Sequence, residues 1–183
     1  MIKILAISGS LRTASLNSAL LRAMARLAKS EMQIDIYTDM GTLPLFNPDL
    51  EASEPVVVTA LRQKIIAADA VLIASPEYAH GITGVMKNAL DWMVGCEVFV
   101  NKPVVILNAS PRATHADASI REIVSMMSAN IIEKASITVP LVGARLDEDA
   151  IVRHPEISLA LIAALDAIEA QLVAPPTSPT LYR

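Results

Sequence analysis

The sequence predicts a doubly wound α/β domain in which a five-stranded parallel sheet, in the order 2-1-3-4-5, lies between two layers of helices. Short, wholly apolar runs alternate along the chain with stretches that repeat apolar residues every three or four positions. These are the patterns of strands buried on both faces and of amphipathic helices. The chain has 183 residues, 53% of them hydrophobic, which is enough for one substantial core. Five strands in a chain of this size favour the stated order.

The domain organisation is simple. No internal repeat or low-complexity tract occurs, and nothing marks a second domain. We therefore expect one domain over residues 1–173. Residues 174–183 include three prolines and are expected to form an extended tail.

The first β-α-β unit is clearly marked. The apolar run from Ile2 to Ile7 predicts a strand, and residues 33–37 predict the next one. Between them, leucine, alanine and methionine recur at helical spacing from Leu16 to Leu27, and Ser15 is placed to cap this helix. Residues 38–55 then form a long loop, which is either functional or a surface excursion pinned by a small apolar cluster.

The rest of the chain continues the alternation of helices and strands. We expect helices at 54–68, 85–94, around 120–127 and at 155–172, and strands at 70–75, 102–109 and 136–139.

The first loop, residues 9–15, has the residue types of a phosphate site. It follows a buried strand, precedes a helix, and contains hydroxyl side chains together with Arg12. Backbone amides at a helix N-terminus attract anions, and a guanidinium matches the oxygens of a phosphate. The alternative is that these polar residues only turn the strand into the helix, but an ordinary cap has no need of Arg12.

The absence of known motifs narrows the class of phosphate-binding site. The chain contains neither G-x-G-x-x-G nor G-x-x-x-x-G-K-[ST], so a dinucleotide site of the Rossmann type and a nucleotide triphosphatase are disfavoured. The first loop has no cysteine, which excludes a thiol phosphatase. The strand ends in Ser8 and not in aspartate, which excludes a phospho-acceptor receiver domain.

Two further loops leave the ends of predicted strands. The second loop runs from Pro76 to Gly84, and the third begins with Ser110, Pro111 and Arg112. In an open parallel sheet, the loops at the carboxyl ends of strands beside the order reversal converge on the ligand. We therefore expect the second loop to face Arg12.

Composition excludes several other classes of function. The formal net charge is −4 and no basic block occurs, which argues against nucleic-acid binding. No apolar run has the 18 to 20 or so residues that cross a bilayer, and no signal-peptide pattern opens the chain. We expect a cytoplasmic protein that does not bind membranes. Cys96 stands alone and is interpreted as a buried small residue or a bystander, and no metal site is predicted.

Two motifs carry a resemblance to a known family. G-S-L-R-T-A-S-L-N (Gly9 to Asn17) and S-P-E-Y-A-H-G-I-T-G-V-M-K-N-A-L-D-W (Ser75 to Trp92) strongly resemble the NADPH-dependent FMN reductase family of quinone, chromate and azo-compound reductases. The resemblance covers nearly the whole chain. It implies a flavodoxin-like fold, FMN and NADPH as cofactors, and a small-molecule electron acceptor as the partner.

The resemblance also implies the binding residues. The FMN phosphate would be held by Ser10, Arg12, Ser15, Leu16 and Asn17, the isoalloxazine ring would be lined by Pro76, Glu77, Tyr78 and Ala79, and the third flavin loop would be Ser110, Pro111 and Arg112.

The chain departs from the family pattern in two places. The family commonly has P-E-Y-N-x-S-x-P-G in the second motif, whereas this chain has Ala79, Gly81 and Thr83 at the Asn, Ser and second Pro positions. The usual glycines of the third loop are also replaced, by residues 113–115.

The chemistry requires no acid–base pair, because the flavin carries the hydride transfer, so no catalytic residue is nominated. His80 is interpreted as a solvent-facing loop residue. Relatives form homodimers or homotetramers with the flavin near the interface, and we expect the apolar face of helix 85–94 (Met86, Ala89, Leu90, Met93 and Val94) to make that contact. A flavodoxin-like electron carrier and a degenerate flavin-binding member without reductase activity remain as alternatives.

Overall fold

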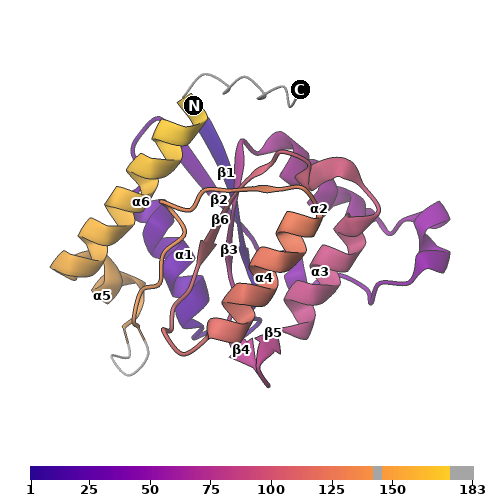
Figure 1. Ribbon diagram of the computed structural model, residues 1–183, viewed down its shortest axis with the longest axis horizontal. Helices are drawn as coiled ribbons and strands as arrows, with labels where there is room; N and C mark the ends of the chain where they lie inside the picture. Colours follow the sequence, from indigo (N-terminus) through magenta and orange to yellow (C-terminus); the bar gives the residue numbers. More distant parts are fainter. Residues whose placement is uncertain (142–145, 174–183) are drawn as a thin grey trace, which may run out of the picture.

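The computed structural model describes residues 1–141 and 146–173, which fold around one central sheet (Figure 1). Its five parallel strands lie in the order β2-β1-β3-β6-β7. They are β1 (Ile2–Ser8), β2 (Met32–Tyr37), β3 (Ala70–Ala74), β6 (Pro103–Leu107) and β7 (Asn130–Ile131). The two remaining strands, β4 (Glu77–Tyr78) and β5 (Gly81–Ile82), form a separate antiparallel hairpin. With that hairpin set aside, the order is 2-1-3-4-5, so the predicted fold is confirmed.

Helices cover both faces of the sheet (Figure 1). One face carries α1 (Leu16–Leu27), α5 (Glu148–Arg153) and α6 (Pro155–Val173), and the other carries α2 (Val56–Ala67), α3 (Gly84–Val94) and α4 (Thr114–Met126). Three 3₁₀ helices lie in the connections: η1 (Asp39–Thr42), η2 (Pro48–Ser53) and η3 (Glu97–Phe99). No helix of the described residues combines the length and apolar character that a bilayer crossing needs.

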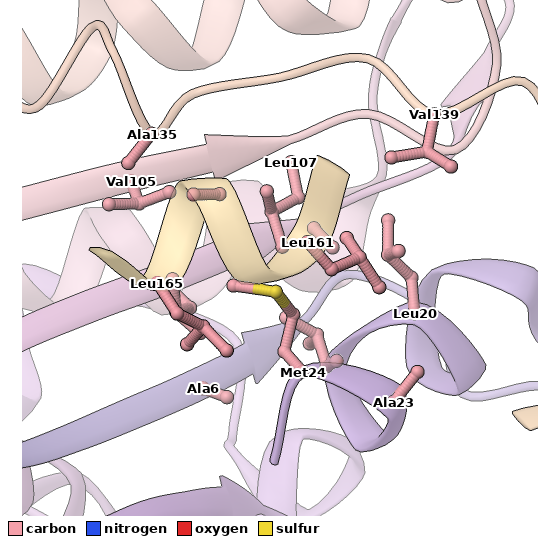
Figure 2. Close-up of a cluster of buried hydrophobic side chains, with 14 of the residues drawn as sticks. Ala6, Leu20, Ala23, Met24, Val105, Leu107, Ala135, Val139, Leu161 and Leu165 are labelled. Carbon is pink, nitrogen blue, oxygen red and sulfur yellow. The ribbon is translucent and has the colours of Figure 1, made fainter. Parts of the chain in front are cut away.

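The strands are buried on both sides because their side chains alternate between two cores. In β1, Ile4 and Ala6 belong to the core under α1 and α6, while Leu5 and Ile7 belong to the core under α2, α3 and α4. Figure 2 shows Met24 of α1 and side chains of α6 meeting over the sheet in the first of these cores. A fully buried aliphatic side chain contributes about 1.5–3 kcal/mol, so the paired cores stabilise the central strands strongly.

The strand order brings two connections together at one end of the sheet. Ser8 at the end of β1 is in register with Ala74 at the end of β3, and the Gly9 N–H donates a hydrogen bond to the Ala74 carbonyl at 2.8 Å. Beyond these strands the chain turns toward α1 on one face and α3 on the other. This is the point of order reversal, where a ligand site is expected in an open α/β sheet.

The fifth strand differs from its prediction. We expected it at residues 136–139, but β7 lies at Asn130–Ile131. The chain then makes a turn in which the Ser136 hydroxyl accepts a hydrogen bond from the Ile106 N–H at 3.1 Å, and it rejoins the sheet edge only at a bridge between Thr138 and Asn108. A side chain therefore takes the place of one backbone bond, which a strand pattern cannot reveal.

The helix bounds differ in smaller ways. The helix expected at 54–68 begins at Val56 because Pro55 is its N-cap residue. The six-residue helix α5 was not predicted, because its length gives too few turns to show a helical period. Residues 174–183, where we predicted an extended tail, lie outside the described residues.

The long loop at 38–55 is anchored on α3. The Trp92 indole N–H and the Asn88 side-chain amide both donate to the Pro44 carbonyl, at 2.8 and 2.9 Å, and the Phe46 N–H donates to the Asn88 side-chain oxygen at 2.8 Å. The rings of Phe46 and Trp92 pack edge to face, with centroids 5.1 Å apart. The loop is thus a pinned surface excursion, which was one of its two predicted interpretations.

The apolar face of α3 is used inside the chain. Met86, Ala89, Leu90 and Met93 are all buried in the second core, and only Val94 is exposed. The prediction that this face contacts another subunit is therefore wrong for four of its five residues, because the amphipathic pattern of a core helix is the same as that of an interface helix.

Candidate functional site

A cavity of about 380 Å³ opens at the carboxyl end of the sheet, between the first, second and third loops. It is lined by Ser10, Arg12, Ala14, Ser15, Leu16, Asn17, Pro76, Glu77, Tyr78, Asn108, Ala109, Ser110, Arg112 and Ala113. Ten of the twelve residues predicted to bind the flavin are among them. Ala79 and Pro111 are not, and each lies next to a lining residue.

The first loop is shaped by hydroxyl groups bonded to nearby backbone amides. The Ser8 hydroxyl accepts from the Ser10 N–H at 3.3 Å, and the Ser10 hydroxyl accepts from the Arg12 N–H at 3.3 Å. Ser8 is held in turn by the Ser18 hydroxyl of α1, at 2.8 Å. These short-range bonds fix the turn and leave Arg12 exposed at the cavity.

The helix α1 begins at this cavity, as expected. Ser15 is its N-cap residue, with its hydroxyl accepting from the Ser18 N–H at 3.3 Å, which confirms the predicted cap. Leu16 and Asn17, in the first turn, line the cavity beside it. The positive end of the helix dipole therefore faces the cavity together with Arg12.

The third loop repeats the construction of the first. The Asn108 side-chain oxygen accepts from the Ser110 N–H at 3.0 Å, and the Ser110 hydroxyl accepts from the Arg112 N–H at 3.2 Å. The Asn108 side-chain amide also donates to the Ala113 carbonyl at 3.2 Å. Sequence reasoning missed Asn108, although the shared spacing of S-L-R and S-P-R, each just after a strand, was a signal that could have pointed to it.

Arg12 and Arg112 thus enter the same cavity from two similar turns. Neither forms an ion pair with any carboxylate of residues 1–141 and 146–173. Guanidinium groups without a carboxylate partner at a concave site are suited to binding an anionic ligand.

The second loop contains the β4–β5 hairpin. Its two turn residues, Ala79 and His80, have φ values of 50° and 58°, as in a type I′ turn. At the far end of the loop, the buried Thr83 hydroxyl donates to the Gly9 carbonyl at 2.7 Å and accepts from the Met86 N–H at 3.2 Å, so it joins the first loop to the N-terminus of α3.

Gly9 lies where the first two loops pass each other. A Cβ atom at this position would lie 2.3 Å from the Ser75 hydroxyl oxygen and 2.7 Å from the Ser75 Cβ. Only glycine lets the backbone of the first loop approach the second so closely.

The hairpin also rests on α4. The Glu77 carboxylate accepts hydrogen bonds from the N–H groups of His115 and Ala116, at 2.9 and 3.0 Å, and the imidazoles of His80 and His115 stack with centroids 4.5 Å apart. His80 is exposed, as expected, but its stacking partner was not foreseen because the two residues are far apart in sequence. Nearly parallel rings do not direct their in-plane nitrogen lone pairs at one ion, so this pair is not arranged as a metal site.

Comparison with known proteins agrees with the fold and the motifs. Residues 2–143 match the model of the NADPH-dependent FMN reductase family. An NADPH:quinone oxidoreductase of Arabidopsis thaliana is 45% identical over 114 residues, which cover 59% of this chain and 58% of that protein. A 2-hydroxy-1,4-benzoquinone reductase of Burkholderia sp is 42% identical over 112 residues, covering 60% of this chain and 61% of that protein. The match therefore spans about three fifths of the length of these relatives.

A solved structure shows the same architecture. FerB from Paracoccus denitrificans, a flavoenzyme NAD(P)H:(acceptor) oxidoreductase, superposes with a TM-score of 0.77 at 26% identity, over 92% of this chain and 98% of that one. The family model covers all five strands of the central sheet and all three loops around the cavity. The chain therefore belongs to the NADPH-dependent FMN reductase family.

Proposed function

We propose that this protein is an FMN-dependent NAD(P)H oxidoreductase that passes electrons to a small acceptor such as a quinone, chromate, an azo compound or free flavin. The observation that carries the proposal is the cavity that an arginine-bearing loop at a helix N-terminus and the hairpin of the second motif line together. The names of the similar proteins, which include quinone and FMN reductases, support the same chemistry.

The residues of the cavity fit FMN. The hydroxyls of Ser10 and Ser15, the guanidinium of Arg12 and the start of α1 offer the donors that a phosphate needs. Asn17 is buried, with an exposed fraction of 7%. Its side-chain oxygen has no hydrogen-bond partner among the described residues. A ribityl phosphate carries hydroxyl groups that would supply this missing bond.

Each loop has a distinct task in this proposal. Ser10, Arg12, Ser15, Leu16 and Asn17 hold the phosphate. The isoalloxazine ring would be lined by Pro76, Glu77, Tyr78 and Ala79, and backbone amides of the hairpin could stabilise the charge on the reduced ring. The third loop, with Ser110, Pro111 and Arg112, closes the cavity on the other side.

FMN, when bound, would supply the two-electron redox chemistry between NAD(P)H and the acceptor. The protein places and holds the ring, and no acid–base residue is assigned. Tyr78 lines the cavity and is 61% exposed, so the cavity wall at this residue is accessible from solvent.

A steady-state assay tests the proposal against its alternatives. FMN-loaded protein is mixed with NADPH and a benzoquinone, and the absorbance of NADPH is followed. We expect rapid oxidation of NADPH with formation of one hydroquinone per NADPH. Slow oxidation combined with fast electron transfer to a one-electron protein acceptor would support a flavodoxin-like carrier instead. Failure to retain FMN would support a degenerate family member and would overturn the proposal.

We also propose a homodimer or homotetramer, located in the cytoplasm, where reduced nicotinamide cofactors are available. Two large apolar side chains remain exposed on α3 and on the loop anchored to it: Val94 at 61% and Leu45 at 82%. Light scattering after size-exclusion chromatography should give a multiple of the monomer mass, and Leu45→Glu should lower it. A monomer at every concentration would contradict the proposed assembly, and cell fractionation tests the location.

A further inference from the structure

The N-termini of α1 and α4 are approached by turns of the same construction but differ in what lies at the helix end. At α1, a serine caps the helix and the cavity lies beside it. At α4, the N-cap residue Ala113 offers no side-chain cap, and the Glu77 carboxylate accepts from the free N–H groups of His115 and Ala116. A carboxylate of the protein therefore takes the position at α4 that an external anion is suited to at α1.

Glu77 reaches α4 from the hairpin, so the cap is also a docking contact. Its backbone lies in β4, paired with Ile82 of β5, and its neighbours Pro76 and Tyr78 line the cavity. The two hydrogen bonds thus tie the cavity wall directly to a helix that is packed on the sheet. Bonds from backbone N–H groups to a charged acceptor are among the stronger hydrogen bonds in proteins.

The turn of this hairpin needs external support. Type I′ turns favour asparagine and glycine at their two central positions, because both adopt positive φ. Here those positions hold Ala79 and His80, both at positive φ, whereas the family pattern has asparagine at the first. The His80–His115 stack adds a second contact between the hairpin and α4.

We propose that Glu77 is a positioning residue: its carboxylate docks the hairpin on the N-terminus of α4 and so fixes the wall against which the flavin ring lies. The His80–His115 stack completes the docking. This inference rests on the proposed function for the identity of the ligand, but the docking itself is a property of the protein alone.

Paired ligand titrations test the inference. FMN and riboflavin share the ring and differ in the phosphate. Glu77→Ala should lower the affinity for both by the same factor, about tenfold, because the ring wall loosens while the phosphate contacts stay. Glu77→Gln keeps an acceptor oxygen and should restore most of the affinity. Both affinities are measured by quenching of flavin fluorescence.

Asp117→Asn is the matched control. Asp117 is an acidic residue in the same first turn of α4, but its carboxylate pairs with Arg121 at 2.8 Å and forms no hydrogen bond to the hairpin among the described residues. The Asp117→Asn substitution should weaken α4 and so lower the melting temperature, but it should leave the affinity for riboflavin unchanged. An equal loss of riboflavin affinity in both variants would show that Glu77 acts only through helix stability and would overturn the inference.

Amide hydrogen exchange in the absence of flavin tests, without any bound ligand, whether Glu77 docks the hairpin on α4. Residues 77–83 should exchange faster in Glu77→Ala than in the wild type or in Asp117→Asn. Unchanged exchange in this segment would overturn the inference. If the wild-type chain bound neither flavin, the proposed function would fail, while the exchange result would still establish or reject the docking.

Discussion

The first and second loops face each other across one cavity, yet they are held by different kinds of contact. The turn of the first loop around Arg12 is shaped by hydrogen bonds between residues at most ten positions apart, such as Ser8 with Ser18, and the long-range bonds of this loop to Ala74 and Thr83 lie at Gly9, where it begins. The second loop is supported by contacts that span 38 residues or more, from Glu77 to His115 and from Thr83 to Gly9. The turn around Arg12, on the phosphate side of the cavity, is therefore organised mainly by its own sequence, whereas the hairpin on the ring side depends on the assembled fold.

This difference suggests separate roles in binding. A turn that is shaped by its local sequence is preorganised, and it can bind the phosphate of a cofactor with little support from distant residues. A hairpin that long-range contacts hold can be altered at its tip while its supports remain. Among the departures from the family pattern, Ala79 lies at the tip of the hairpin, which agrees with this division, whereas Thr83 is itself one of the supports.

The sharpest way to separate the two sides is to remove the guanidinium of the first loop. Arg12→Ala should lower the affinity for FMN about 100-fold, because hydrogen bonds to charged groups contribute about 1.5–3 kcal/mol, while riboflavin affinity stays the same. Fluorescence titration with both flavins measures the ratio. Arg12→Lys, which keeps the charge without the planar donors, should be intermediate. An equal loss for both flavins would contradict the assignment of Arg12 to the phosphate.

The next largest effect is expected where the two sides touch. Gly9→Ala should lower the free energy of unfolding by about 2 kcal/mol, because the new methyl group meets Ser75 at 2.3–2.7 Å and forces the loops apart. Urea denaturation measures it. Gly84→Ala is the control, since nothing lies within 4 Å of its Cβ position and alanine favours the helix. An unchanged free energy of unfolding in Gly9→Ala would show that the two loops can move apart without loss of stability.

The predictability of the site from sequence follows the same division. The strand, the turn and the Ser15 cap of the first loop were predicted, because each depends on residues adjacent in the chain. Sequence also placed the second and third loops at the same end of the sheet, since parallel strands end together. The capping of α4 by Glu77 and the stacking of His80 on His115 could not be predicted, because nothing in local spacing reports a contact between distant residues.

The fold shows the same limit. The order of the sheet was correct because buried strands and core helices have strong periods. The fifth strand was misplaced because its true extent is two residues, too short for any pattern, and because the Ser136 side chain replaces a backbone partner of Ile106. The apolar face of α3 was misassigned because its residues pack in the second core, and a core helix has the same period as an interface helix.

A smaller effect is expected at the tip of the hairpin. Ala79→Asn should raise the free energy of unfolding by about 0.5–1 kcal/mol, because asparagine tolerates the positive φ of 50° better than alanine does. Ala79→Val should change it in the opposite direction, since a β-branched residue is strained there. Both are measured by urea denaturation. The same substitution is also made in the Glu77→Ala variant. If Ala79→Asn raised the free energy of unfolding more there than in the wild type, the turn and the docking contact would be shown to support each other.

The smallest effect is expected behind the first loop, where α5 is paired with α1. Glu148 accepts from Arg22 at 2.8 Å, and Asp149 accepts from Arg26. The hydrogen bond and the positive charge of Arg26 lower the pKa of the Asp149 carboxyl below its usual range. Because this pKa is lower in the folded chain than the value of about 3.9 in the unfolded chain, the pair stabilises the fold above that value, and the contribution is lost as the pH falls through the folded-state pKa.

Asp149→Asn should therefore reduce the urea midpoint slightly at pH 7 and by progressively less as the pH falls below about 3.9, with a smaller reduction in high salt because the pair is exposed. FMN affinity at pH 7 should not change, since the first loop is shaped by its own hydroxyl and amide bonds and needs no support from α5. A loss of FMN affinity in this variant would show that the first loop, like the second, depends on contacts with distant parts of the chain, and the contrast between the two sides of the cavity would then disappear.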